Sequence, residues 1–122
     1  LYGRGGMAGL CIADIGCGEG RYSRYLSGKG ASVLGIDPVE EFINQAITRH
    51  PEGNYRVGFG ESLPVEDGSI DLALCYLSLL DIEDQDAVIS EIGRVVKAGG
   101  RCVVVAISNM CSSTEGWVKD SD

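Results

Sequence analysis

The sequence predicts an α/β fold, an open sandwich in which helices cover both faces of a mostly parallel sheet. Short apolar segments bounded by glycine or proline alternate along the chain with segments whose apolar residues recur at helical spacing. The apolar segments have no polar face to expose to water, which is typical of buried parallel strands. Strands that alternate with helices in this way indicate parallel pairing through crossover connections.

The first half of the chain contains three expected strands and two expected helices. We expect strands at 10–15, 32–36 and 55–57, and helices at 21–26 and 40–49. Acidic residues at the start of the second helix and an arginine at its end suit the helix dipole. The residues expected on the apolar helix faces are Tyr22, Tyr25 and Leu26 in the first helix, and Phe42, Ile43, Ala46 and Ile47 in the second.

The second half continues the alternation after an irregular segment at 60–68, where a proline and an Asp-Gly turn stand. We expect a strand at 70–76, a helix at 84–97 and a β-branched strand at 101–107. From residue 108 the chain is polar and has no periodicity. The expected buried stripe of the last helix is Val88, Ile89, Ile92, Val95 and Val96.

The chain has the length of one domain, because 122 residues bury one sizeable core. We expect a flexible, glycine-rich segment over 1–9, a folded core over 10–107 and a polar tail over 108–122.

The charge of the chain restricts its partners. The formal net charge is −8, whereas a protein that binds nucleic acid normally carries a basic face. We therefore expect no nucleic-acid partner. No apolar run approaches 18 residues and no signal-peptide pattern is present, so we expect no membrane association.

The cysteines indicate neither a metal site nor disulfides. The chain has five cysteines, none in C-x-x-C spacing, and its single histidine, His50, is far from all of them in sequence. A zinc site is therefore not expected. An odd number of free thiols fits the reducing cytoplasm, which is the expected location. His50 is expected to be a surface cap at a helix end.

A glycine-rich turn directly follows the first strand. In parallel sheets, ligands bind beyond the carboxyl ends of the strands, where glycine lets the backbone approach closely. A dinucleotide fingerprint would need a third glycine at position 21, which is Arg21. The carboxylate of Asp14 also repels pyrophosphate and attracts an ammonium group. The turn therefore favours a ligand without phosphates. A nucleotide-dependent oxidoreductase is the least favoured functional hypothesis.

Residues 12–20, IADIGCGEG, resemble the first motif of class I S-adenosylmethionine-dependent methyltransferases of the small-molecule type. Segments 33–37, 60–71 and 91–101 resemble later motifs of that family, in the family's order and spacing. The resemblance implies a three-layer Rossmann-like sandwich with strand order 3-2-1-4-5, truncated after the fifth strand. It implies S-adenosylmethionine as cofactor, S-adenosylhomocysteine as product, and in-line transfer of a methyl group to a small-molecule acceptor.

The resemblance also assigns roles to single residues. Asp14 and the backbone of Gly16–Gly18 would hold the amino-acid end of the cofactor, and Asp37 would accept hydrogen bonds from the ribose hydroxyls. Alternatives stay open: Asp14 as a strand-end cap, and Asp37 as part of an Asp-Pro turn. The complete set expected at the cofactor is Asp14, Gly16, Cys17, Gly18, Gly20, Tyr22, Asp37, Pro38, Gly60, Glu61, Ser62, Cys75, Tyr76 and Leu77.

Three of these expectations have alternatives or departures of their own. Gly60 and Glu61 would lie near adenine, but Phe59 stands where the family usually has an acidic residue, so the ring could stack on adenine and Glu61 could substitute as acceptor. Cys17 is expected to pack against the ligand, because no histidine or lysine stands nearby to activate it as a nucleophile. Tyr22 and Tyr76 could border the methionine end of the cofactor, or they could pack at the rim of the site without contacting it.

The ends of the chain raise a second functional hypothesis. Family domains continue past the fifth strand with a helix and two strands, whereas about 15 residues follow that strand here, so we expect a fragment. An exposed fifth-strand edge would favour a homodimer. The alternative to an enzyme is a non-catalytic module that binds the cofactor or a protein. No catalytic residue is predicted, since methyl transfer depends mainly on positioning.

Overall fold

Six strands form a single sheet in the order β3-β2-β1-β4-β5-β6 in the computed structural model, which describes residues 7–76, 85–107 and 114–120. The first five strands pair in parallel, and the sixth is antiparallel to the fifth. The predicted order 3-2-1-4-5 is therefore confirmed. The strands are β1 (Cys11–Ile15), β2 (Ser32–Asp37), β3 (Asn54–Val57), β4 (Ile70–Tyr76), β5 (Val96–Ile107) and β6 (Thr114–Asp120).

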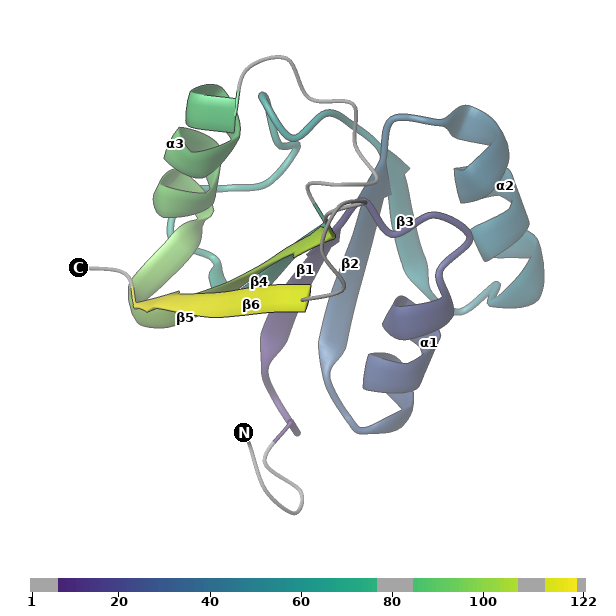
Figure 1. The fold of residues 1–122 in the computed structure, drawn as a ribbon. Coiled ribbons are helices and arrows are strands. Elements are labelled where there is room, and N and C mark those ends of the chain that lie inside the picture. The colour runs from purple at the N-terminus through teal and green to yellow at the C-terminus, as the bar shows by residue number, and fades with distance from the viewer. Residues whose placement is uncertain (1–6, 77–84, 108–113, 121–122) are drawn as a thin grey trace.

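Helices cover both faces of the sheet, which makes the predicted three layers. In Figure 1, α1 (Arg21–Gly28) and α2 (Glu40–Arg49) lie to the right of the sheet, and α3 (Gln85–Val95) lies to the left. None of the helices in the described ranges combines the length and the apolar character that crossing a membrane requires.

The face that α1 buries differs from the predicted one. Ser23 and Leu26 are buried, whereas Tyr22 and Tyr25 are 54% and 61% exposed. The cause is a hydrogen bond from the Ser23 hydroxyl to the buried carboxylate of Asp14. This bond turns Ser23 and Leu26, which are three residues apart, toward the sheet and leaves the tyrosines outside.

The buried apolar faces of α2 and α3 each include fewer residues than predicted. α2 packs on β2 and β3 at the edge of the sheet, so Ile43 and Ala46 are buried while Phe42 and Ile47 remain more than 40% exposed. In α3 the predicted Ile89 is 37% exposed. The other residues that were predicted to be buried with it are buried: Val88, Ile92, Val95 and Val96.

The end of the chain differs most from the prediction. β5 begins at Val96, directly after α3, and not at residue 101 as predicted. The register of its pairing with β4 shifts between Ile70 and Leu72. Within the segment expected to be a polar tail, residues 114–120 form a strand, β6, where no strand was predicted. Because β6 pairs along β5, the edge that was expected to be exposed is covered, and the reason for predicting a dimer there no longer holds.

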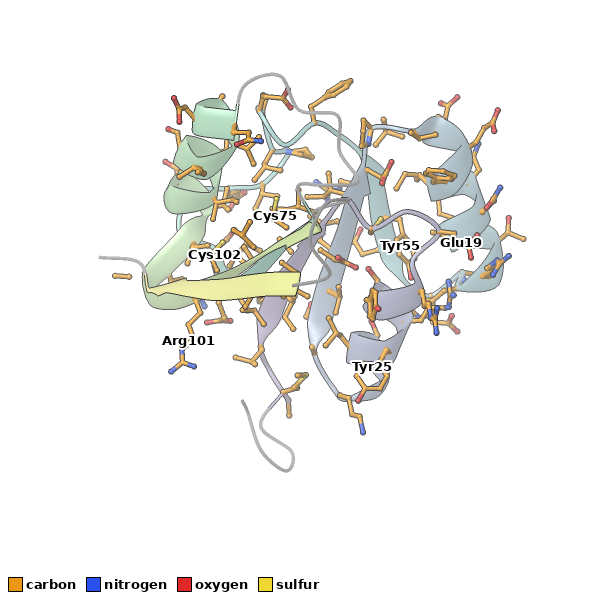
Figure 2. All side chains as sticks on the ribbon, viewed as in Figure 1. Glu19, Tyr25, Tyr55, Cys75, Arg101 and Cys102 are labelled. Atoms are coloured by element: carbon orange, nitrogen blue, oxygen red, sulfur yellow. The ribbon has the colours of Figure 1, made fainter. Side chains whose placement is uncertain are left out.

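Apolar clusters lie on both faces of the sheet and fix the central strands. On the α1 side, Ile12 of β1 packs with Leu26 and Val33. On the α3 side, alternate residues of the same strand, Ala13 and Ile15, belong to a larger cluster. Cys75 and Cys102 are in that cluster, and Figure 2 labels both on neighbouring strands. β1 is thus held on both sides, so the turn that follows it starts from a rigid base.

Candidate functional site

The carboxyl ends of β1 and β2 converge, as the sequence predicted. Ile15 pairs in register with Ile36, and the backbone N–H groups of Gly16 and Cys17 both donate to the carbonyl of Ile36, at 2.7 and 3.0 Å. The glycine turn is therefore bonded to the end of the neighbouring strand. Ligands of open parallel sheets bind at such a position.

The glycines of the turn serve two different purposes. Gly16, Gly18 and Gly20 all have positive φ, at 85°, 57° and 87°, where residues with a Cβ are strained. A Cβ on Gly18 would meet no described atom within 4 Å, so this part of the turn is open to a ligand. A Cβ on Gly20 would lie 2.9 Å from Cε1 of Tyr55, so this part packs on β3.

Asp37, at the end of β2, is bonded to the turn. Its Oδ2 accepts a hydrogen bond from the Gly18 N–H at 2.9 Å, and its Oδ1 accepts one from the Val39 N–H at 2.9 Å. The bond from Val39 belongs to the local Asp-Pro turn, which was the alternative role left open for Asp37. The bond from Gly18 is not part of that turn, because it joins Asp37 to the glycine turn after β1. Each carboxylate oxygen has a further lone pair, so Asp37 retains acceptor capacity. In this structure its side chain is 5% exposed.

Asp14 is the most unusual group at the site. It is fully buried, and its Oδ2 accepts a hydrogen bond from Ser23 Oγ at 2.7 Å. Its Oδ1 is also buried and has no hydrogen-bond partner among the described residues. Burial raises the pKa of this carboxyl to about 6; the Ser23 hydrogen bond opposes the rise, and the charge of Asp37 adds to it.

The thiol of Cys17 lies in the same negative environment. Burial raises its pKa to about 12, and the charges of Asp14 and Asp37 contribute to the rise. The side chain packs against the cluster of Ile43, Ala46 and Tyr55. A thiol with this pKa stays protonated at neutral pH, which argues against a nucleophile. The described contacts of Cys17 are with the protein core, and its packing against the ligand stays a prediction.

The two carboxylates determine which ligands suit this edge of the sheet. Asp14 and Asp37 flank the glycine turn and are close enough for the charge of Asp37 to raise the pKa of Asp14. Two carboxylates so placed favour ammonium groups and hydroxyl donors as ligands. Asp14, beside the turn, disfavours a pyrophosphate there, in addition to the missing third glycine. Asp37 does not separate the two ligands, because dinucleotide sites also carry an acidic residue at this strand end.

A tight turn after β3 reaches the same edge of the sheet. The Ser62 N–H donates to the Phe59 carbonyl at 3.1 Å, and the Gly58 N–H donates to the Asp37 carbonyl at 3.1 Å. Gly60 is buried, whereas Phe59, Glu61 and Ser62 are exposed. The turn that the sequence associates with adenine thus begins beside the end of β2.

Of the site residues predicted at and after the end of β4, the structure describes the side chain of Cys75. The side chain of Cys75, which was predicted to lie at the cofactor, is fully buried in the cluster beneath α3. Burial raises the pKa of its thiol to about 12. Leu77 and the side chain of Tyr76 lie outside the described residues. Tyr22 is exposed in the first turn of α1, immediately after the glycine turn.

Sequence reasoning missed Ser23 and Tyr55. Ser23 was detectable as a small polar residue in a first helical turn of large side chains. Tyr55 lies under the glycine turn, and Figure 2 shows it on the side of the sheet that α1 and α2 cover. His50 is the C-cap of α2, as predicted, but its side chain is not at the surface: it is 17% exposed and its Nδ1 lies 2.7 Å from the Tyr55 hydroxyl.

Comparison with known proteins agrees with this geometry. Residues 13–104 match the family model described as methyltransferase domain. The chain is 34% identical over 110 residues to the ubiquinone biosynthesis O-methyltransferase of Pseudomonas paraeruginosa, covering 86% of this chain and 47% of that protein. It is 33% identical over 103 residues to the malonyl-[acyl-carrier protein] O-methyltransferase of Salmonella typhimurium, covering 84% and 40%.

Among solved structures, the chain is similar to an S-adenosylmethionine-dependent methyltransferase from Mesorhizobium loti, with a TM-score of 0.75 and 31% identity. That likeness covers 82% of this chain and 48% of the other. The chain thus spans less than half the length of each of these three proteins.

Proposed function

The chain belongs to the methyltransferase domain family, and from this premise we propose that it binds S-adenosylmethionine at the carboxyl ends of β1 and β2. We propose further that it serves methyl transfer to a small-molecule acceptor. The net charge of −8 supports a small molecule over a nucleic acid, because a polyanion would be repelled.

The observation that carries the proposal is the buried Oδ1 of Asp14, which has no hydrogen-bond partner in the part of the chain that the structure describes. A buried acceptor without a donor costs about 1–3 kcal/mol, so its presence beside an open glycine turn calls for a ligand that donates. The ammonium group of the cofactor's methionine end is such a donor. The residues present therefore fit the cofactor at this end.

The remaining residues have matching roles in the proposal. Asp37 accepts from the ribose hydroxyls with the lone pairs that Gly18 and Val39 leave free. The Phe59–Ser62 turn borders adenine. There the exposed Phe59 ring offers an aromatic surface, and Glu61 offers an acceptor.

When bound, S-adenosylmethionine supplies a methyl group on a positively charged sulfonium, which an acceptor can attack in line. The chain's own contribution is to orient the cofactor: Asp14 holds its methionine end and Asp37 its ribose, both on one pair of strands. Orientation of this kind can supply much of the rate of a displacement. The two carboxylates also favour a cationic ligand. We assign no general base to the described residues.

Calorimetric titration tests the binding proposal. S-adenosylmethionine and S-adenosylhomocysteine should each bind at one site, and NAD should give no binding heat. Binding of NAD alone, or no binding of either sulfur compound at about 1 mM, would overturn the proposal. Transfer is then tested with radiolabelled S-adenosylmethionine, a malonyl thioester and a ubiquinone precursor. Label in neither acceptor, despite tight binding, would favour the non-catalytic module.

A further inference from the structure

Arg94 of α3 is bonded to the segment that follows the Phe59–Ser62 turn. Its Nη2 donates to the Leu63 carbonyl at 3.0 Å, and its Nη1 donates to the Val65 carbonyl at 2.8 Å. Nη1 also donates to Asp67 Oδ1 at 2.6 Å. One guanidinium thus holds three residues of an irregular segment. A planar group with five donors is suited to this, and an ammonium is not.

Glu91, one turn earlier on the same helix, completes the arrangement. Its Oε1 accepts the Leu63 N–H at 2.7 Å, and its two oxygens accept from Arg94 Nη2 and Nε at 2.9 and 2.7 Å. Its hydrogen bond with Arg94 holds the pKa of the Glu91 carboxyl below its ordinary value. Both backbone polar groups of Leu63 are therefore fixed by one ion pair on α3.

A third contact comes from the preceding turn of α3. A Cβ on Gly60 would lie 3.2 Å from Cγ2 of Val88, so the middle of the Phe59–Ser62 turn rests on that side chain. Val88, Glu91 and Arg94 recur every three residues and lie along one face of the helix. This face holds the segment from Gly60 to Asp67.

We propose that Glu91 and Arg94 are positioning residues for the cofactor: through Leu63 they hold the Phe59–Ser62 turn beside Asp37 in the arrangement that receives adenine. The inference rests on the proposed function. Neither side chain contacts the cofactor in this account. Both act through the backbone of the segment that leads away from the turn.

The expected loss of affinity for the cofactor follows from the fraction of molecules in which the Phe59–Ser62 turn is correctly placed. The apparent dissociation constant rises by the reciprocal of the fraction of molecules whose turn is correctly placed. If that fraction falls to about one tenth without the guanidinium, the Kd for S-adenosylhomocysteine rises about tenfold.

Two variants of Arg94 and one control test the proposal. Arg94→Met removes the donors. Arg94→Lys keeps a positive charge beside Glu91 and Asp67 but cannot bridge both carbonyls, and it serves if the methionine variant fails to fold. The control is Lys97→Met, which removes a neighbouring ion pair, Lys97 Nζ to Asp71 Oδ1 at 3.1 Å, that lies away from the turn.

Two readouts are taken on each protein: the Kd for S-adenosylhomocysteine by calorimetry, and hydrogen exchange of the Leu63 amide by NMR. We expect Arg94→Met to raise the Kd about tenfold and to speed the exchange. Arg94→Lys should fall between it and wild type, and Lys97→Met should leave both readouts unchanged. A folded Arg94 variant with the wild-type Kd would overturn the positioning role, whereas failure of the wild type to bind would instead overturn the proposed function.

Discussion

The backbone N–H of Gly18 donates to Oδ2 of Asp37 at 2.9 Å, and this bond joins the turn after β1 to the end of β2. It places an open glycine next to a carboxylate that can still accept hydrogen bonds. In the proposed complex, hydroxyl and ammonium donors of one ligand bond to Asp37 and Asp14 at this edge of the sheet.

Replacement of Asp37 by asparagine tests the contact with the ribose. The side chain keeps its shape and one carbonyl oxygen, but it loses the charge that strengthens hydrogen bonds from hydroxyls. We expect the Kd for S-adenosylhomocysteine to rise about tenfold to a hundredfold, the range for one or two hydrogen bonds to a charged group. Calorimetry measures the change. Asp86→Asn, at an exposed position on α3, is the matched control and should bind normally; equal affinities of the two variants would refute the ribose assignment.

The pH dependence of stability tests the burial of Asp14. Its pKa is about 6 in the folded protein, against an ordinary 3.8. Between these values the folded chain binds more protons than the unfolded chain, so the free energy of unfolding falls as pH rises from about 4 to about 6 and is then constant. The contribution is about 3 kcal/mol. Urea unfolding measured from pH 4 to 8 should show this fall.

Asp14→Asn should remove that dependence and raise stability at pH 7.5 by up to about 3 kcal/mol, because no ionised group remains buried. The same variant should bind S-adenosylhomocysteine more weakly. A variant that is less stable than wild type at pH 7.5, or that binds equally well, would show that Asp14 is only a structural cap.

The reactivity of Cys17 tests its packing role. With a pKa of about 12, fewer than about one thiol in ten thousand is ionised at pH 7.5. We expect iodoacetamide to modify Cys17 far more slowly in the native protein than in urea, as followed by mass spectrometry. Cys17→Ser should retain cofactor binding. Rapid native modification of Cys17 would instead indicate an activated nucleophile.

The contact between Gly20 and Tyr55 is tested by alanine. Gly20→Ala combines positive φ with a Cβ 2.9 Å from the Tyr55 ring, whereas Gly68→Ala has φ of +59° but no described atom within 4 Å. Backbone strain alone costs about 1–2 kcal/mol, and overpacking adds about 1–3 kcal/mol. Thermal unfolding should show the larger loss for Gly20→Ala, and similar losses would mean that the turn moves away from β3 without cost.

The strands and their order were predictable because they depend on local pattern: short apolar runs, glycine stops and alternating helices. The convergence of Gly18 and Asp37 was predictable for the same reason, since each follows a strand end. The buried face of α1 was not, because Ser23 is turned inward by Asp14, nine residues away and on another element. Periodicity reports which residues are apolar but not what each helix packs against.

Other differences also have non-local causes. α2 lies at the edge of the sheet, so part of its apolar stripe has no strand beneath it. β6 was missed because its residues show no alternation, and its pairing with β5 was not evident from the residues alone. Glu91 and Arg94 stood in a recognised motif, but their bonds to Leu63 connect residues 28 and 31 positions apart.

The carboxyl of Asp14 offers the most direct test of the proposed cofactor site. Its titration can be followed by NMR of carbon-13-labelled aspartate, in the free protein and with saturating S-adenosylhomocysteine. In the free protein we expect a pKa near 6. An ammonium group placed at Oδ1 favours the ionised form and should lower that pKa by at least about one unit. An Asp14 resonance that titrates identically with and without the compound would contradict the account.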